Sequence, residues 1–476
     1  MTGTGPSRRG IIAGGGAVGL ASMIPYARAA AQARVTAHVA DFGAKGDGLT
    51  NDTRAIHAAA KAIERAGGGM LVFDPKTYII GTQSRAPSVS GWAFEPAPVV
   101  DIRDCANKVT VRGNGAVLRC ADGLRYGTFD PRTGTSTRNS LPFTDVNQLA
   151  SPYRAAVWLQ DNRGGVEITD LEIDGRIAKA IIGGPWGDTG WQINHCGLWL
   201  YNNRGAHLVR NVNAHHHGQD GLLLFTEIKN ENDAAVPMRV EDFRAEFNGR
   251  QGLSLTGGKG VVLQRCVLSN TGRNGVVVSN PGAGLDIEAE LSLIRDVTVN
   301  DCRFDNNYGQ GFVADTGNSA GITFNRCIFV GATNYAVWPN KPRIRFVNCE
   351  FVGGLVKCYE DPRGTALATQ FVGCRFTDDP ARGASRRVYG SRIDLGGSGG
   401  GTLFDRCMFA YARGMQLPYT PQTVRYRDCR MIQRSRETAY PAGIFLGRNI
   451  ITGPVRLGSS RYLGTLVVNG AAIPRN

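Results

Sequence analysis

The sequence VVLQRCVLSN at 261–270 is the first of seven ten-residue segments that share one pattern, with a cysteine at the sixth position. The others are VTVNDCRFDN (297–306), ITFNRCIFVG (322–331), IRFVNCEFVG (344–353), TQFVGCRFTD (369–378), TLFDRCMFAY (402–411) and VRYRDCRMIQ (424–433). Successive cysteines are 36, 25, 22, 25, 33 and 22 residues apart, and a period in this range indicates a repeat architecture. Apolar and polar residues alternate within each segment, as in β-strands, and no helical stretch separates them. The pattern predicts one rung of a parallel β-helix per repeat.

The same frame continues upstream of the first cysteine segment. The segments NVNAHHHGQDGLLLF (211–225), DFRAEFNGRQGLSLT (242–256), CVLSNTGRNGVVVS (266–279) and CRFDNNYGQGFVAD (302–315) align without a gap. Val212 and Phe243 occupy the cysteine position in two rungs, so this position should face the interior. We expect an all-β solenoid of roughly ten or more rungs between about Asp101 and the C-terminus, with its cysteines stacked inside and unbridged.

The first 33 residues predict an export signal. Arg8 and Arg9 precede an apolar run rich in glycine and alanine, and small residues between Ala27 and Ala33 offer cleavage sites. This arrangement resembles a twin-arginine signal peptide. It predicts a periplasmic or secreted protein with no stable membrane insertion after cleavage, and an uncleaved anchor helix is the alternative.

The charge balance favours an anionic partner. The formal net charge is +14, of which the predicted signal supplies three arginines. Basic residues are scattered, and no nucleic-acid-binding motif appears. We therefore expect an acidic polysaccharide and no nucleic acid, unless the charge serves solubility alone.

Residues 34–100 are expected to form a cap and the first strands. Thr53–Ala66 carries apolar residues on one helical face, with Asp52 or Thr53 as N-cap, and such a helix can cover the first rung. The stretch from Asp41-Phe42-Gly43-Ala44 through Asn51-Asp52-Thr53 to Gly67-Gly68-Gly69 resembles the opening of the pectate-lyase-like superfamily. That resemblance implies a right-handed parallel β-helix in one domain, 34–476, with the rungs and a C-terminal cap over 101–476. It does not fix a reaction, because this scaffold carries several chemistries.

The resemblance also points to three successive rungs. In polygalacturonase-type hydrolases such rungs present Asn-Thr-Asp, Asp-Asp and Gly-His-Gly motifs, each just before a strand. The similar positions here are Asn194-His195-Cys196, Gln219-Asp220 and Arg250-Gln251. Only Asp220 keeps a carboxylate, whereas glycoside hydrolysis usually uses two. The similarity therefore predicts the place of the site and argues against that mechanism.

Histidines concentrate at this place, since five of the seven lie between His195 and His217. In the alignment His215 occupies a hydrophilic position and His217 a turn position, both close to Asp220. His215, His217 and Asp220 are the predicted catalytic residues. A three-histidine metal site at 215–217 is disfavoured, because consecutive strand residues face opposite ways.

The residues around this cluster suit an anionic sugar. Arg250 and Arg273 lie at the same turn one and two rungs further along, where guanidinium groups can bind carboxylates. Trp186 and Trp191 belong to an insertion that can stack on sugar rings or pack on the solenoid wall. Together with His195, these are the predicted substrate-binding residues.

The segment GLDIEAE (284–290) predicts a strand whose acidic residues share the outer face. These acids can pair with Arg273 or Arg303, or bind calcium or substrate. Asp286 and Glu288 are the candidate calcium ligands, and calcium is the one cofactor that the sequence suggests.

Uronate lyases and epimerases both neutralise the substrate carboxylate and then remove the proton at C5. Histidines and arginines with one aspartate suit that chemistry better than hydrolysis. The sequence therefore favours an exported enzyme that resembles a polysaccharide lyase or uronan epimerase. The alternatives are a glycoside hydrolase that pairs Asp220 with a second carboxylate, and a non-catalytic glycan-binding or structural β-helix.

Overall fold

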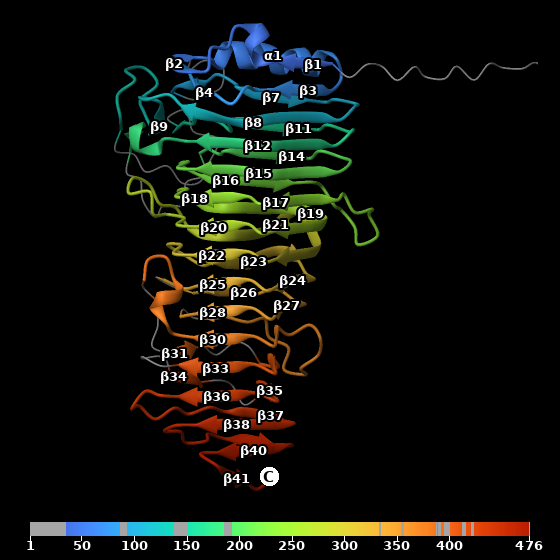
Figure 1. Ribbon diagram of the computed structural model, residues 1–476, viewed down its shortest axis with the longest axis vertical. Coiled ribbons are helices and arrows are strands. Elements are labelled where there is room, and N and C mark those ends of the chain that lie inside the picture. The colour runs from blue at the N-terminus through green and yellow to red at the C-terminus, as the bar shows by residue number, and fades with distance from the viewer. Residues whose placement is uncertain are drawn as a thin grey trace, which may run out of the picture. The chain divides into compact units, whose positions relative to one another are not determined.

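Strands of successive rungs pair in parallel and stack along one axis (Figure 1). This computed structural model describes residues 35–85, 93–137, 150–184, 193–332, 335–353, 357–386, 388, 392–394, 400–411, 416–419 and 423–475. Val35–Asn476 form one unit. The predicted signal, 1–33, lies outside the described residues. The all-β parallel architecture predicted from the repeats is confirmed.

Three sheets make up the stack. Sheet 1 contains β7 (Val100–Arg103), β11 (Val157–Gln160), β14 (Leu198–Tyr201), β16 (Asp220–Phe225), the first parts of β19 (Gln251–Gln264) and β21 (Ala283–Asn300), β23 (Phe312–Ser319) and β26 (Val337–Pro339). Its side chains alternate between the interior and an outer face, because successive residues of a strand point to opposite sides.

Sheet 2 contains β1 (Thr36–His38), β3 (Gly69–Val72), the first parts of β8 (Val109–Cys120), β12 (Val166–Asp174) and β15 (His207–His215), β17 (Met238–Glu241), the second parts of β19 and β21, β24 (Ile322–Asn325), β27 (Ile344–Val347), β29 (Gln370–Val372), β32 (Leu403–Asp405), β35 (Arg425–Arg427), β37 (Gly443–Leu446) and β39 (Ser460–Tyr462). Long strands such as β15 and β19 turn a corner and so belong to two sheets.

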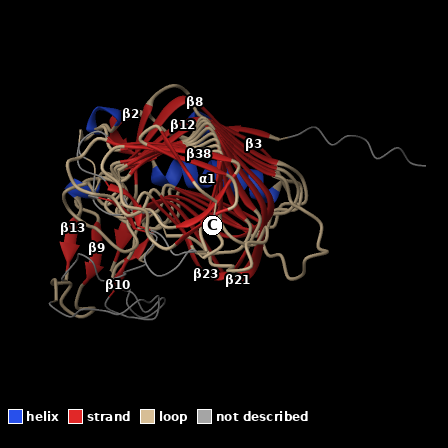
Figure 2. Ribbon diagram, turned by 90° about the horizontal axis from the view of Figure 1, so that it is seen from below, coloured by secondary structure: helices blue, strands red, loops and turns tan. Residues whose placement is uncertain are grey.

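Sheet 3 contains β2 (Asp47–Asn51), β4 (Thr77–Ile80), the second parts of β8, β12 and β15, β18 (Arg244–Glu246), β20 (Val267–Ser269), β22 (Arg303–Asp305), β25 (Ile328–Val330), β28 (Glu350–Val352), β30 (Arg375–Thr377), β33 (Met408–Tyr411), β36 (Arg430–Gln433), β38 (Arg448–Thr452) and β40 (Thr465–Val468), which pairs antiparallel with β41 (Ala471–Ile473). Figure 2 shows β9 (Arg125–Thr128), β10 (Ala150–Ser151) and β13 (Ile181–Gly183) beside the stack. The remaining short strands are β5 (Gln83–Ser84), β6 (Glu95–Pro96), β31 (Arg392–Asp394) and β34 (Gln416–Tyr419).

Like side chains stack inside the C-terminal rungs. One row consists of Phe304, Phe329, Phe351, Phe376 and Phe409, with successive ring centroids 4.7, 5.2, 4.8 and 4.7 Å apart. A second row consists of Phe324, Phe346, Phe371, Phe404 and Tyr426, at 4.9, 5.0, 4.9 and 5.4 Å. Offset stacking of this kind adds stability beyond the burial of apolar area.

All eleven cysteines are buried and free, which confirms the prediction of an unbridged interior ladder. The backbone N–H of Cys266 donates to the Sγ of Cys302 at 3.2 Å, and that of Cys327 donates to Cys349 at 3.4 Å. Burial raises the pKa of Cys327 and so keeps its thiol protonated. These thiols are part of the core.

The helix expected over Thr53–Ala66 is α1 (Thr53–Arg65), and it buries Ile56 and Ile63. Asp52 and Thr53 do not cap it in the predicted way. The Asp52 carboxylate accepts the N–H groups of Lys45 and Gly46, and the Thr53 hydroxyl accepts that of Gly81. Among the described residues, no helix is long and apolar enough to cross a membrane.

Candidate functional site

A buried charge network lies at the start of neighbouring strands of sheet 1. Asp220 begins β16, and its Cα partner on β19 is Gln251. The Oδ2 of Asp220 accepts a hydrogen bond from Ser254 Oγ at 2.8 Å and lies 3.5 Å from Arg250 Nη1. The Nη2 of Arg250 reaches Glu288 of β21, 2.9 Å from its Oε2. The Asp220 and Arg250 side chains are only 0% and 3% exposed, so the chain has removed both charged groups from water.

Asp286 joins this network from β21. Leu285 and Ile287 on either side of it are completely buried, so Asp286 and Glu288 share the outer face, as predicted. The Nε2 of Gln251 donates a hydrogen bond to Asp286 Oδ2. Asp286 is itself buried under its neighbours.

The arginines expected to neutralise these acids have other partners. Glu288 pairs with Arg250, whereas Arg303 pairs with Asp305. Arg273 donates to the carbonyl of Asn306 and lies over the ring of Tyr308. Of the two arginines predicted to bind substrate, Arg250 lies in the network, where both of its terminal nitrogens face the chain's own carboxylates.

Burial changes the acidity of this cluster. It raises the pKa of Asp220 to about 6, although Arg250 acts in the opposite direction. The pKa of Asp286 lies well above its usual range, first because of burial and then because of the Glu288 charge. Asp315 on β23 has a raised pKa for the same two reasons. The site therefore places Asp286, a carboxyl group whose pKa burial raises, beside Glu288, a carboxylate that is ion-paired with Arg250.

Three buried polar atoms at the centre have no hydrogen-bond partner among the described residues. They are Asp220 Oδ1, Arg250 Nε and Gln251 Oε1. Buried polar atoms are nearly always hydrogen-bonded. Three unpaired atoms on two neighbouring rungs are unfavourable for stability, and such local violations are expected at functional sites.

Two depressions open on this network. One, of about 270 Å³, is lined by Arg250, Asp286, Glu288, Asp315 and Trp338. The other, of about 190 Å³, shares Arg250 and Glu288 and extends to Trp199 and Tyr201. The carboxyl groups of β21 therefore lie between two hollows on one face of sheet 1.

Aromatic side chains flank the network along sheet 1. Trp158 and Trp199 occupy paired positions on β11 and β14, and their rings stack at 4.4 Å. On the other side, Trp338 of β26 carries Lys357 over its ring at 4.3 Å. Paired positions run from Trp199 through β16, β19, β21 and β23 to Trp338. Five strand steps of about 4.8 Å place the two tryptophans roughly 24 Å apart.

The predicted histidines do not join Asp220 on this face. His217 is completely buried, and burial lowers its pKa to about 3. It occupies the interior turn position that Asn248 and Asn307 hold in later rungs, where each asparagine caps a neighbouring backbone. His217, one of the predicted catalytic residues, is therefore not accessible to a substrate in this structure, because the turn directs its ring inward.

His195 is also an interior residue rather than a surface ligand for substrate. It is 1% exposed, its ring packs on Tyr153 and Tyr126, and its Nδ1 accepts the N–H of Gly218. Burial holds its pKa well below the usual range. This side chain cannot contact a polysaccharide where it lies.

His215 is on another face. Its Cα partners are Asp174 of β12 and Glu246 of β18, so it belongs to sheet 3. Its ring lies 3.5 Å from Glu172 and 2.7 Å from His216. The structure therefore separates His215 from Asp220, although the two residues are only five positions apart in the chain. Trp186 and Trp191 lie outside the described residues.

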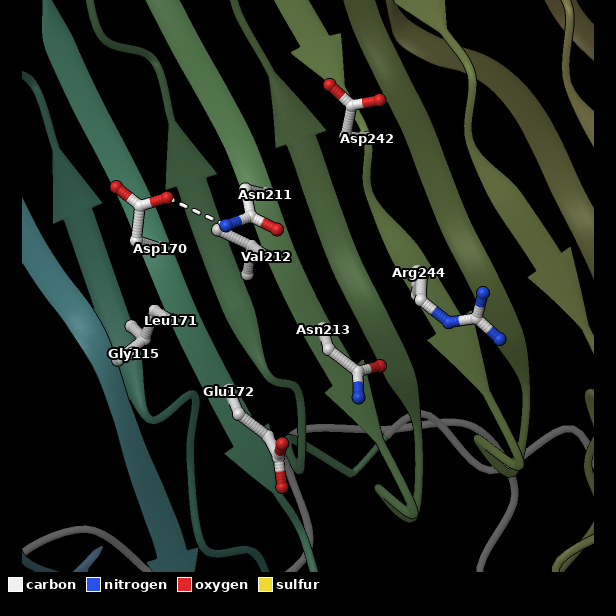
Figure 3. A pocket seen from close by; sticks show the side chains of 9 residues that line it. All are labelled: Gly115, Asp170, Leu171, Glu172, Asn211, Val212, Asn213, Asp242 and Arg244. Carbon is white, nitrogen blue, oxygen red and sulfur yellow. Dashed lines mark hydrogen bonds between the residues drawn. The ribbon is translucent and has the colours of Figure 1, made fainter. Parts of the chain in front are cut away.

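A further depression, of about 200 Å³, lies on the outer surface at the corner between sheets 2 and 3 (Figure 3). Asn211 donates to Asp170 across it at 2.7 Å, and Glu172 lies at one end. Its lining combines polar side chains with Gly115, Leu171 and Val212, and it shares no residue with the two depressions on sheet 1.

A family model described as the right handed beta helix region matches residues 155–351. The A-module of mannuronan C-5 epimerase AlgE4 from Azotobacter vinelandii is similar in structure, with a TM-score of 0.53 and 14% identity over 91% of this chain and 97% of that chain. This chain has the right-handed parallel β-helix fold.

Other β-helix proteins are similar over comparable lengths. The N-terminal fragment of bacteriophage phi29 gene product 12 has a TM-score of 0.51 and 14% identity, covering 92% of this chain and 72% of that chain. An exopolygalacturonase from Thermotoga maritima has a TM-score of 0.34 and 11% identity, covering 92% and 93%. No curated protein matches the chain in sequence. At such identities the similarity shows the β-helix and leaves the reaction open.

Sequence reasoning missed the tryptophan row. Ala156-Val157-Trp158, Gly197-Leu198-Trp199 and Ala336-Val337-Trp338 repeat one pattern of small residue, inward apolar residue and outward tryptophan. This pattern is only three residues long and recurs in rungs of unequal length, so its repetition is hard to recognise in the sequence. In the structure the rungs stack, and the tryptophans come to the same face.

Proposed function

We propose that this β-helix protein is a carbohydrate-active enzyme that binds a polysaccharide along the outer face of sheet 1 and cleaves it at Asp286 and Glu288. The observation that carries the proposal is the pair of outward carboxyl groups on β21: burial raises the pKa of Asp286, and Glu288 is paired with Arg250. Cleavage of a glycosidic bond uses such a pair. Of the alternatives considered from the sequence, the glycoside hydrolase therefore has the most support.

In this proposal Asp286 donates its proton to the glycosidic oxygen as the bond breaks. Glu288 acts as base toward water or as nucleophile toward the sugar carbon. Asp220 is a positioning residue, because it holds Arg250, and Arg250 in turn holds Glu288. The two reacting carboxyl groups of this proposal therefore lie on β21, two rungs beyond Asp220, and do not include Asp220 itself.

The aromatic residues supply the binding surface. Trp199 and Trp338 lie on opposite sides of the carboxyl pair, so a chain of several sugar rings can span the distance between them. Arg103 and Arg154 lie near Trp158, and Lys357 lies over Trp338. These cations at the two ends suit acidic sugar units, so an acidic polysaccharide remains the expected substrate class.

The second candidate is the lyase or epimerase reaction. In that case Asp286, whose pKa burial raises, would donate a hydrogen bond to the uronate carboxylate before the C5 proton is lost. Glu288 would then be the base.

Product analysis distinguishes these reactions. The purified protein is incubated with uronan and neutral polysaccharides, and new reducing ends and the ultraviolet absorbance of unsaturated uronates are followed together. Hydrolysis gives reducing ends without absorbance, and this is the expected result. Absorbance would establish a lyase, and exchange of the C5 hydrogen with solvent without cleavage would establish an epimerase. Binding with none of these signals would overturn the enzyme proposal in favour of a glycan-binding protein.

We also propose export through the twin-arginine pair. Replacement of Arg8 and Arg9 by Lys should trap the folded precursor in the cytoplasm, measured by cell fractionation and immunoblotting. Unimpaired export of this variant would contradict the twin-arginine assignment.

A further inference from the structure

Two histidines and an aspartate meet on the outer face of sheet 3, away from the carboxyl groups of sheet 1. Asp174 ends β12, and its Cα partner on the next rung is His215 at the end of β15. One potential ligand atom from each of Asp174, His215 and His216 lies within 4.8 Å of the other two. All three side chains are half-buried, so small ions in solution can reach them.

The two histidine rings converge because the strand ends between them. His215 belongs to β15, whereas His216 has a φ of 56°, in the left-handed region. Phe247 and Asn270 adopt the same conformation at this turn in later rungs. The rule that consecutive residues face opposite ways holds only inside a strand. The turn swings His216 back, and the two Nδ1 atoms are 2.7 Å apart.

Neighbouring side chains hold these rings in place. His216 stacks on Phe247 with centroids 5.0 Å apart and an interplanar angle of 17°. The Nε2 of His215 lies 3.5 Å from Glu172, the carboxylate at one end of the depression in Figure 3. Metal-binding histidines generally direct their second ring nitrogen at a carboxylate in this way, which fixes the tautomer and leaves the first nitrogen for the metal.

The carboxylate of Asp174 is also held in place by its neighbours. Its Oδ2 accepts a hydrogen bond from Arg119 Nε at 3.3 Å, while its Oδ1 faces His215 Nδ1 at 3.8 Å. Two imidazole rings this close either share one hydrogen bond or direct a lone pair each at a common cation.

We propose that Asp174, His215 and His216 bind one divalent transition-metal ion, of which zinc is the test case. Two imidazole nitrogens and one carboxylate oxygen suit zinc, cobalt, nickel or copper, whereas calcium and magnesium prefer oxygen ligands alone. Three protein ligands leave a fourth position for water or a ligand. The ion would also join the ends of β12 and β15 on adjacent rungs.

The full chain, purified without a histidine tag and stripped with a chelator, is titrated with zinc by calorimetry. We expect one zinc ion per chain. His215→Ser and His216→Asn should each abolish saturable binding. Both substitutions place at this turn the residues that the aligned rung already has, Ser269 and Asn270, so the turn should be preserved. Glu172→Gln should weaken binding by about tenfold, as loss of a carboxylate behind a metal ligand generally does.

His38→Ala is the matched control, because His38 is exposed on β1 and should leave binding unchanged. The wild-type chain is also loaded with cobalt, whose visible spectrum should show nitrogen and oxygen ligands and no thiolate band. A thiolate band would assign the ion to the buried cysteines and overturn the proposal. It would equally be overturned by a wild-type chain that shows no saturable binding, or by folded His215→Ser and His216→Asn variants that bind zinc as tightly as the wild type.

Discussion

Two parts of the β-helix share one fold but bury different side chains. We call the rungs from Cys302 to Phe445 the C-terminal rungs and those from His195 to Asp315 the central rungs. The C-terminal rungs stack phenylalanine on phenylalanine and cysteine on cysteine. The central rungs bury Asp220, Arg250 and Asp286 in a network with unpaired polar atoms. Among the described strands, sheet 1 ends at β26, whereas sheets 2 and 3 continue to β39 and β40.

This difference separates the scaffold from the site. A ladder of identical apolar side chains needs no hydrogen-bond partners, and each rung buries the apolar surface of the next. Buried charges cost free energy unless every group is paired, and here the pairing is incomplete. The incompletely paired Asp220–Arg250–Asp286 network therefore costs stability in the central rungs, and mutations can test whether that cost serves function.

The largest expected effect is on turnover. Asp286→Asn should lower kcat by about 10²- to 10⁴-fold, because the amide cannot donate the proton that the reaction needs. Asp296→Asn is the control: Asp296 lies on the same strand, is exposed, and has a φ of 54° that asparagine tolerates. Loss of activity in the control, or full activity of Asp286→Asn, would remove Asp286 from the mechanism.

The second effect is on stability as a function of pH. Asp220 has a pKa of about 6 in the folded chain against an ordinary value of 3.8. Between these pH values the folded state binds more protons than the unfolded state, so the free energy of unfolding falls as pH rises. From pH 4 to pH 7 the free energy of unfolding of the wild type should fall by about 2 kcal/mol relative to that of Asp220→Asn, which cannot ionise.

Urea unfolding of both proteins at the two pH values measures this difference. An equal difference at pH 4 and pH 7 would mean that Asp220 is ionised at its ordinary pKa in the folded chain. It would also mean that burial of the Asp220 carboxylate does not destabilise the central rungs.

For the C-terminal rungs we expect a mutation to change stability without changing turnover. Cys327→Ser places a hydroxyl group in the interior ladder, and we expect a loss of about 1 to 3 kcal/mol in the free energy of unfolding. Turnover should not change, since the ladder lies outside the sheet 1 depressions. Urea unfolding and a turnover assay check the two parts, and a lower kcat in the folded variant would show that the ladder and the site are coupled.

The smallest effect is on substrate affinity. Trp199→Ala should raise KM about two- to tenfold with little change in kcat, as expected for one aromatic stacking contact. Tyr440→Ala, at an exposed tyrosine outside both depressions, should leave KM unchanged. If both variants behave alike, the tryptophan row does not bind the polymer.

The sequence predicted the scaffold because the scaffold repeats. The cysteine period, the interior position and the outward face of Asp286 all follow from strand alternation, which is local. The histidines were misassigned because turns decide their direction. His217 turns inward and His216 swings toward His215, through backbone conformations that a strand pattern does not contain. The pairing of Asp220 with Arg250 and Glu288 crosses three rungs whose loops differ in length, so only the stacked structure reveals it.

The central claim is that the carboxyl groups of sheet 1, and not the histidines, perform the reaction. It is tested most directly by the release of reducing ends by Glu288→Gln, His215→Ser and wild-type protein on the same polysaccharide. We predict that Glu288→Gln loses activity by about 10²-fold or more while His215→Ser keeps that of the wild type. An active Glu288→Gln together with an inactive but folded His215→Ser would contradict the account and move the site to sheet 3.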